Sequence, residues 1–191
     1  MKLGVTVLRA AVGGAFFAHG AQKLFGWFGG HGLEGTGQAF DQMGLRPGRR
    51  TALSAGAAET GGGALIATGL FTPLGTAAVV GVMDQAVRTV HLDKGFFASD
   101  GGYEYNLVLT AAAVALADAG PGPISLDRAL GTGRSGPFWA LAALAAGLAG
   151  PRLLERLAPE PEPQTAPEPE QPAEEPRFTR DAAPAPTSTP A

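Results

Sequence analysis

Cysteine is absent from this 191-residue chain. Its absence excludes thiol–disulfide exchange, iron–sulfur clusters and thiolate zinc sites built on this chain alone. Charge is scarce as well: 14 Lys and Arg against 17 Asp and Glu give a net charge of −3, which leaves no basic surface of the kind that nucleic acid requires. Any chemistry of the chain must therefore rest on its histidine, carboxylate and tyrosine side chains.

Proline is concentrated at one end of the chain. Ten of the 16 prolines lie between Pro159 and Ala191, among glutamate, alanine and threonine. Such a segment cannot bury enough apolar surface to offset the entropy of ordering it, so we predict that 159–191 is a disordered, acidic tail. Residues 1–158 are rich in alanine, glycine, leucine and valine and poor in charge, and they must contain the fold.

Five long apolar segments dominate residues 1–158. They are apolar around most of their circumference, unlike the surface helices of a soluble protein, which carry a polar stripe. The first four are each close to the minimum for crossing a hydrocarbon core of ~30 Å, and Phe71-Thr72-Pro73 predicts a tight turn between the second and the third. The five segments are Leu3–Phe28, Thr51–Phe71, Leu74–Val90, Tyr105–Ala119 and Gly136–Leu154.

The predicted fold is an all-α membrane protein: an antiparallel four-helix transmembrane bundle with a fifth C-terminal helix. A soluble alanine-rich bundle is the alternative. Arg9 interrupts the apolar core that a cleaved signal peptide would need, and Asp118 could pair with it at the same end of the bundle. Small residues spaced four apart would let the helices approach closely, as in membrane bundles. These small residues are Ala10, Gly14 and Ala18 in the first segment and Ala57 and Gly61 in the second.

Antiparallel connectivity places most ionisable residues of these helices in one half of the bundle. Glu59 lies roughly 12 Å inside the second helix, about level with His19 near the end of the first. Residues three, four and seven apart share a helix face, and charged groups inside a membrane normally face the protein interior, pair with one another and mark function. We therefore expect one polar network around a cavity at this mouth of the bundle. Its candidate binding residues are His19, Gln22, Lys23, Glu59, Asp84, Arg88, His91, Tyr103 and Glu104.

A purely structural explanation of these residues also exists. The charges can satisfy one another and reach the membrane surface, and the aromatic residues near them can form the belt found at headgroup level. Glu59 is the hardest to explain in this way, because it is deep and flanked by alanine and glycine. His19, His91, Glu59 and Glu104 could form a metal site across helices, although no single helix carries two histidines at the spacing that zinc requires.

Four sequence blocks resemble the DoxX family of small bacterial membrane proteins: HGAQKLFGWFGGHGLEGTGQAF, AETGGGALIATGLFTPLG, HLDKGFFASDGGYEYNL and GPGPISLD. The resemblance covers about residues 3 to 130 and implies a four-helix membrane bundle with short loops. Relatives include the small subunit of thiosulfate:quinone oxidoreductase. A mycobacterial branch is proposed to join superoxide dismutase and a sulfurtransferase in a membrane-associated oxidoreductase complex. The family brings no settled catalytic residues, so none is carried over to this chain.

We divide the chain into a DoxX-like membrane domain at 1–130, a linker and fifth transmembrane helix at 131–158, and the tail at 159–191. The leading hypothesis is a multi-pass subunit of the bacterial inner (plasma) membrane that is linked to redox chemistry and is not catalytic alone. It would bind a quinone-like or other small molecule in the polar cavity and associate with soluble enzymes of the superoxide dismutase or sulfurtransferase type. One alternative is a membrane scaffold without chemistry. The other is a small-solute transporter, which the lack of evident inverted repeats disfavours.

Overall fold

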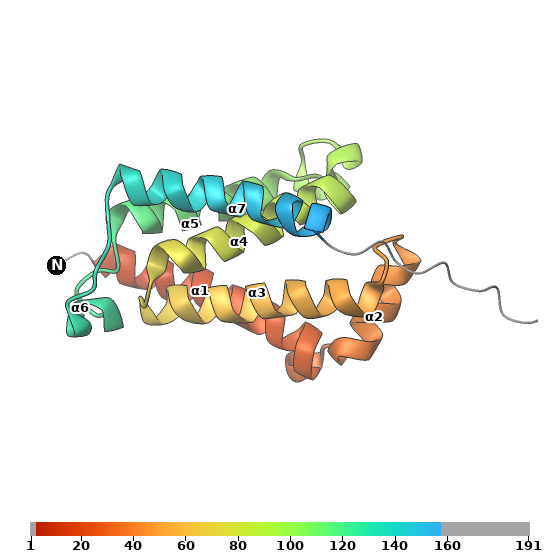
Figure 1. Ribbon diagram of the computed structural model, residues 1–191, viewed down its shortest axis with the longest axis horizontal. Helices are drawn as coiled ribbons and strands as arrows, with labels where there is room; N and C mark the ends of the chain where they lie inside the picture. Colours follow the sequence, from red (N-terminus) through yellow and green to blue (C-terminus); the bar gives the residue numbers. More distant parts are fainter. Residues whose placement is uncertain (1–2, 158–191) are drawn as a thin grey trace, which may run out of the picture. The chain divides into compact units, whose positions relative to one another are not determined.

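The computed structural model describes residues 3–157, and the predicted disordered tail lies outside the described residues. The helices belong to the first of two units into which the chain divides, residues 1–161 and 162–191. Within residues 3–157 the structure contains helices and no strand (Figure 1). The elements are α1 Leu3–Phe25, η1 Trp27–Gly29, α2 Gly32–Gln42, α3 Gly48–Thr68, α4 Thr72–Ala86, η2 Val87–His91, η3 Leu92–Lys94, η4 Ala98–Asp100, α5 Glu104–Ala119, α6 Leu126–Leu130 and α7 Pro137–Leu157.

Five long helices, α1, α3, α4, α5 and α7, form the bundle, and each coincides with one of the predicted apolar segments. The all-helical fold is thereby confirmed. Helix α1 packs along α3, α3 packs against α4, and α4 also contacts α5 and α7 (Figure 1). Because α7 lies against both α4 and α5, the predicted fifth helix is packed into the same bundle as the first four.

A tight turn joins α3 to α4, as the sequence predicts. Gly69 adopts a left-handed conformation with φ 64°, and its N–H donates to the carbonyl of Ile66 at the end of α3. Leu70 closes the same turn by donating to Leu65 at 3.0 Å. Pro73 then lies in the first turn of α4, where its missing N–H costs no helical hydrogen bond. The turn therefore returns the chain along α3 and places the charged residues late in α4 near the beginning of α3.

Glycines hold α1 and α3 together, but they are not the ones that the sequence analysis selected. A Cβ at Gly13, Gly20 or Gly63 would overlap backbone atoms of the opposite helix. Gly14 and Gly61 are exposed, with no neighbouring atom within 4 Å of an added Cβ, so the predicted contact stripe was wrong. One residue along a helix turns the side chain by about 100°, which is enough to move a small residue from the interface to the surface.

Helix α2 is not among the five segments predicted from the sequence. Gly37 and Gly48 lie where α2 meets α3, and a Cβ at Gly48 would overlap the backbone of Gly37 and Asp41. Asp41 also accepts a hydrogen bond from the backbone N–H of Gly48 at 2.7 Å. The glycines here permit close packing of two helices, and their cost to helix stability is offset by that contact. His31, just before α2, is exposed.

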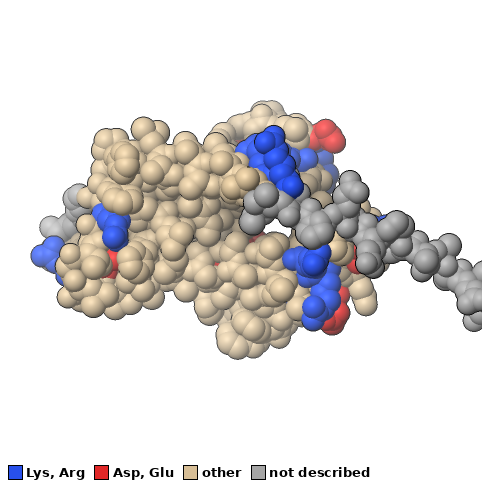
Figure 2. Space-filling model, viewed as in Figure 1, with Lys and Arg blue, Asp and Glu red and all other residues tan. Residues whose placement is uncertain are grey.

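Large apolar side chains remain exposed along the bundle, among them Val7 on α1, Leu74 on α4, Val108 on α5 and Phe138 on α7. In the face shown by Figure 2, charged side chains lie toward the two ends and the surface between them is uncharged. Among the described helices, α1 is the one that is long and apolar enough to pass a length-and-composition test for a membrane span. The four-helix crossing predicted from the sequence is not established by that test.

Candidate functional site

Lys23 and Glu59 form an ion pair between α1 and α3, with Nζ and Oε2 2.6 Å apart. The side chain of Glu59 is 7% exposed and that of Lys23 is 24% exposed. Gly56, one turn before Glu59, lets α1 come close, since a Cβ there would lie 2.7 Å from the side chain of Leu24. Glu59 is thus paired with a basic residue of the neighbouring helix, Lys23.

Asp84 is the centre of a second charged group, at the end of α4. Its Oδ2 accepts from Arg88 Nε at 3.0 Å, and its Oδ1 accepts from Arg152 Nη2 at 3.2 Å. Arg88 also donates to the side-chain oxygen of Gln85 at 2.8 Å. Both oxygens of a largely buried carboxylate are thus engaged, and α7 supplies one of the two guanidinium groups.

The next candidates, His91, Tyr103 and Glu104, contact the loop between η3 and α5. His91 Nδ1 lies 2.6 Å from the carbonyl oxygen of Gly101; because a carbonyl only accepts, Nδ1 carries a proton and donates. Glu104 accepts from the backbone N–H of Ala98 at 3.0 Å. Tyr103 packs edge-to-face on Phe96, with ring centroids 5.6 Å apart. His91 and Glu104 thus hold the shape of the loop.

The remaining candidates, His19 and Gln22, lie on α1. His19 is exposed and makes no hydrogen bond or ion pair with any described residue, whereas Gln22 donates to the backbone oxygen of Phe28 at 3.2 Å. Within the described part of the chain, no hydrogen bond or ion pair joins the Lys23–Glu59 pair to Asp84. The nine candidates therefore form separate local groups, where the sequence predicted one network.

The four residues considered for a metal site have different environments: Glu59 pairs with Lys23, while His91 and Glu104 bind loop backbone. Across residues 3–157, no three His, Asp or Glu side chains are placed to hold one ion.

A hollow of about 170 Å³ opens between α4, α5 and α7, and it includes two of the nine candidates, Asp84 and Tyr103. Asn106, from α5, is the residue that the sequence analysis missed. It is 6% exposed, and its side-chain amide donates to the Sδ of Met83 at 3.5 Å, a weak acceptor. The sequence feature that could have identified Asn106 is an amide side chain inside an otherwise apolar helix. The other lining residues are Val80, Met83, Val87, Leu107, Thr110 and Leu148.

At the opposite end of the bundle, Arg9 is 4% exposed and does not pair with Asp118, so that predicted pairing is wrong. Its guanidinium donates to three backbone oxygens, those of Ala67 at 3.2 Å and of Pro121 and Ile124. Asp118 lies exposed near the end of α5. Carbonyl groups at the end of α3, such as that of Ala67, lack helical partners. The arginine binds there, where the sequence predicted that it would bind a carboxylate.

Comparison with known proteins yields one family. Residues 4–92 match the model of the family described as DoxX. No curated protein and no solved structure matches the chain. The matched residues include α1 to α4 and the turns up to Leu92, so α5 and α7, which supply much of the hollow around Asn106, lie beyond them. DoxX proteins are membrane-associated, in agreement with the apolar length of α1.

Proposed function

From the match of residues 4–92 to the DoxX family model, we propose that the chain is a multi-pass subunit of the bacterial inner membrane that binds a small lipid-soluble molecule. The site is the hollow between α4, α5 and α7. The exposed apolar surfaces of α1, α4, α5 and α7 support the membrane location, because apolar patches of this kind are uncommon on a soluble monomer. Helix α4 continues through η2, which lengthens the helical segment to Thr72–His91.

The observation that carries the proposed ligand is the environment of Asn106. A buried amide whose donor meets only a thioether retains much of its hydrogen-bonding capacity. It lies in the wall of a hollow that is otherwise mostly apolar, beside Tyr103 and Asp84. A flat ring with hydrogen-bonding oxygens on its edge suits that combination, since its faces contact the apolar lining and its oxygens meet the polar side chains.

The size of the hollow limits the ligand. At about 170 Å³ it is smaller than the roughly 300–1,000 Å³ of sites that enclose a drug-sized molecule. It accommodates a single ring while an attached tail extends into lipid. A quinone has this shape, with a compact polar ring and an apolar chain. We therefore propose a quinone headgroup as the occupant.

In this role the chain would hold the quinone for a soluble oxidoreductase. Reduction to the quinol takes two electrons and two protons, and the electrons would come from that partner enzyme. Tyr103 and Asn106 would orient the ring by donating hydrogen bonds to its oxygens, and the Asp84 carboxylate would accept from a hydroxyl of the quinol. The superoxide dismutase and sulfurtransferase types implied by the DoxX resemblance are the partners to examine first.

The test is binding of a short-chain quinone to the purified full chain in detergent, measured by isothermal titration. Asn106→Leu removes the amide at nearly constant volume and should weaken binding about ten-fold, since leaving a ligand oxygen without its donor costs about 1–3 kcal/mol. His19→Ala is the matched control, because His19 was a candidate but lies outside the hollow. Loss of binding in His19→Ala with normal binding in Asn106→Leu would contradict the proposed site. A parent protein that binds no quinone would favour the scaffold role.

A further inference from the structure

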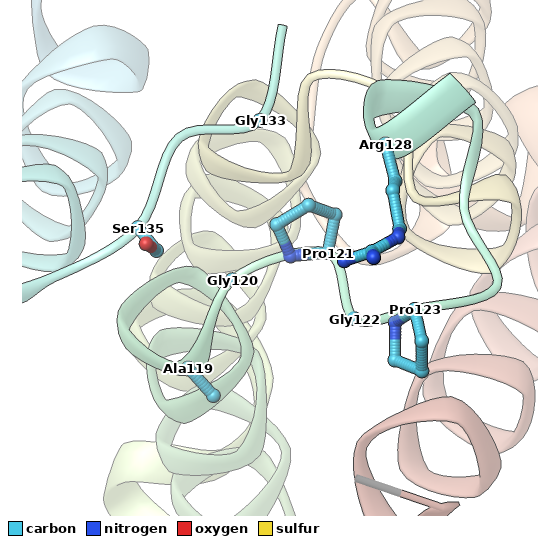
Figure 3. A pocket seen from close by; sticks show the side chains of 8 residues that line it. All are labelled: Ala119, Gly120, Pro121, Gly122, Pro123, Arg128, Gly133 and Ser135. Carbon is cyan, nitrogen blue, oxygen red and sulfur yellow. The ribbon is translucent and has the colours of Figure 1, made fainter. Parts of the chain in front are cut away.

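A second hollow lies at the other end of the bundle, about 410 Å³ in volume. Figure 3 shows it between the turn that follows α5 and the segment that leads into α7, with Arg128 extending from α6 over Pro121 and Gly122. Its lining residues are Ala119, Gly120, Pro121, Gly122, Pro123, Arg128, Gly133 and Ser135. None of them is a candidate of the quinone site, and nothing in the proposed function uses them.

Buried Arg9 fixes the direction of the peptide groups in this turn. It binds the carbonyl oxygens of Pro121 and Ile124, so both carbonyls face the bundle interior. In a trans peptide the C=O and the following N–H point in opposite directions, so the N–H of Gly122 faces away from Arg9. Among residues 3–157 that N–H has no hydrogen-bond partner. The turn therefore presents a free donor beside the guanidinium of Arg128.

Arg128 is the one charged residue among the described residues that line the hollow. Within the described residues, the side chain of Arg128 has no hydrogen bond or ion pair. The neighbouring Asp127 makes no ion pair with it, because the Asp127 side chain is fully buried and accepts from Thr132 at 2.8 Å. Arg134 adds a further positive charge, stacked on Phe71 and Trp139 at 5.3 and 5.4 Å. Asp118 is the exposed acid at this end, and it is not part of the lining.

Exposed apolar side chains lie beside this positive hollow. Ile124 is 62% exposed, Leu126 46% and Leu130 65%, and the two leucines are one helical turn apart on α6. Burial of such side chains in the acyl region would place Arg128 at the level of the headgroups. Free phosphate would make no use of them, whereas a phospholipid would contact both the apolar side chains and the guanidinium.

The geometry points to a binding site for the phosphate group of an anionic phospholipid, held by Arg128, the N–H of Gly122 and the hydroxyl of Ser135. The site requires the membrane location proposed above, but it is independent of the quinone hollow. Arginine is suited to this role because its planar fork matches two oxygens of one phosphate.

The experiment is a titration of the full chain in uncharged detergent with short-chain phosphatidylglycerol, followed by the thermal unfolding midpoint. Short-chain phosphatidylcholine serves as the neutral reference. Phosphatidylglycerol should raise the midpoint saturably. Arg128→Gln should raise the half-saturating concentration roughly five-fold, which corresponds to about 1 kcal/mol per basic residue near an anionic surface. Arg128→Lys should show an intermediate loss, because it retains the charge without the fork.

The matched control is Arg50→Gln, which removes an exposed arginine at the opposite end of the bundle and should leave the half-saturating concentration within two-fold of the parent. Equal weakening by both variants, or none by Arg128→Gln, would overturn the site. A saturable shift with inorganic phosphate alone, at matched ionic strength, would overturn the lipid as its source. Quinone binding should be unchanged in Arg128→Gln, so the two proposals fail independently.

Discussion

The two ends of the bundle compensate buried charge in different ways. At the end where α1 meets the beginning of α3, side chain pairs with side chain: Lys23 with Glu59, and Asp84 with Arg88 and Arg152. At the other end, Arg9 binds only backbone oxygens. Side-chain partners are charged residues, which a sequence shows directly. Backbone partners depend on where a helix ends and on how a distant loop folds.

The difference has a mechanical consequence. Two of these ion pairs, Lys23–Glu59 and Asp84–Arg152, join helices that already pack together, since α1 contacts α3 and α4 contacts α7, while Asp84–Arg88 lies within one helical segment. Arg9 joins three segments that are far apart in sequence: its own helix, the end of α3 at Ala67, and the turn at Pro121 and Ile124. We therefore expect the Arg9 end to be the more sensitive to a single substitution.

The largest effect is expected for Arg9→Met, which preserves an apolar stem but removes the donors of three carbonyl groups. Each buried acceptor left without a donor costs about 1–3 kcal/mol, so the total should be about 3 kcal/mol or more. Unfolding in a detergent–denaturant titration would measure it. Asp118→Asn is the control suggested by the sequence, and it should leave stability unchanged. A loss in Asp118→Asn comparable to that in Arg9→Met would restore the side-chain pairing that the structure contradicts.

Glu59→Leu should have the next largest effect. Breaking a wholly buried pair costs ~3–5 kcal/mol, and partial solvent access of Lys23 should reduce the loss to about 2 kcal/mol. Glu59→Gln should retain more stability because its amide oxygen can still accept from Lys23.

The matched control for that substitution is Glu34→Leu, which breaks the pair between Glu34 and Arg49, whose side chains are 72% and 63% exposed. Its cost should be ~0–1 kcal/mol. Equal losses in Glu59→Leu and Glu34→Leu would show that the Lys23 pair is effectively in water.

The sequence predicted more at one end of the molecule than at the other, for physical reasons. Apolar runs and Pro73 located the long helices and their hairpin, because burial and the missing proline N–H act locally. Helical depth also placed Glu59 about level with His19, which lies one turn before Lys23, the partner of Glu59, on the same helix. It could not decide whether the charged groups were one network, since that depends on helix rotation. The backbone partners of Arg9 could not be predicted from the sequence, because every residue has a carbonyl group and the sequence does not show which ones face the arginine.

Helix rotation also explains the error in the glycine stripe. Gly13 and Gly20 are seven residues apart on α1, and Gly56 and Gly63 are seven apart on α3, a spacing that keeps one face toward a partner helix. The four-residue spacing of Ala10, Gly14 and Ala18 is equally regular in the sequence. Only the contacts distinguish the two stripes.

Gly20→Ala should therefore cost about 1 kcal/mol. Overpacking typically costs about 1–3 kcal/mol, and the better helix propensity of alanine offsets part of that loss. Gly14→Ala, on the exposed face of the same helix, should be neutral or slightly stabilising. Thermal unfolding of the two variants side by side would test the assignment. The reverse order would mean that α1 is rotated relative to α3.

Arg152→Gln should have the smallest effect, and it tests whether α7 completes the charged end. Arg152 is 45% exposed and binds the same carboxylate that Arg88 already holds, so its removal should cost less than about 1 kcal/mol. Yet Arg152 reaches Asp84 from beyond the matched DoxX residues, and Asp84 lines the hollow proposed to bind a quinone. Freed from Arg152, the carboxylate can turn toward the ligand, where it would repel the carbonyl oxygens of a quinone, so quinone affinity should fall more than two-fold while stability barely moves. Arg156→Gln, on the same helix, is the control. If Arg152→Gln alters neither quantity, α7 contributes only its apolar face to the hollow.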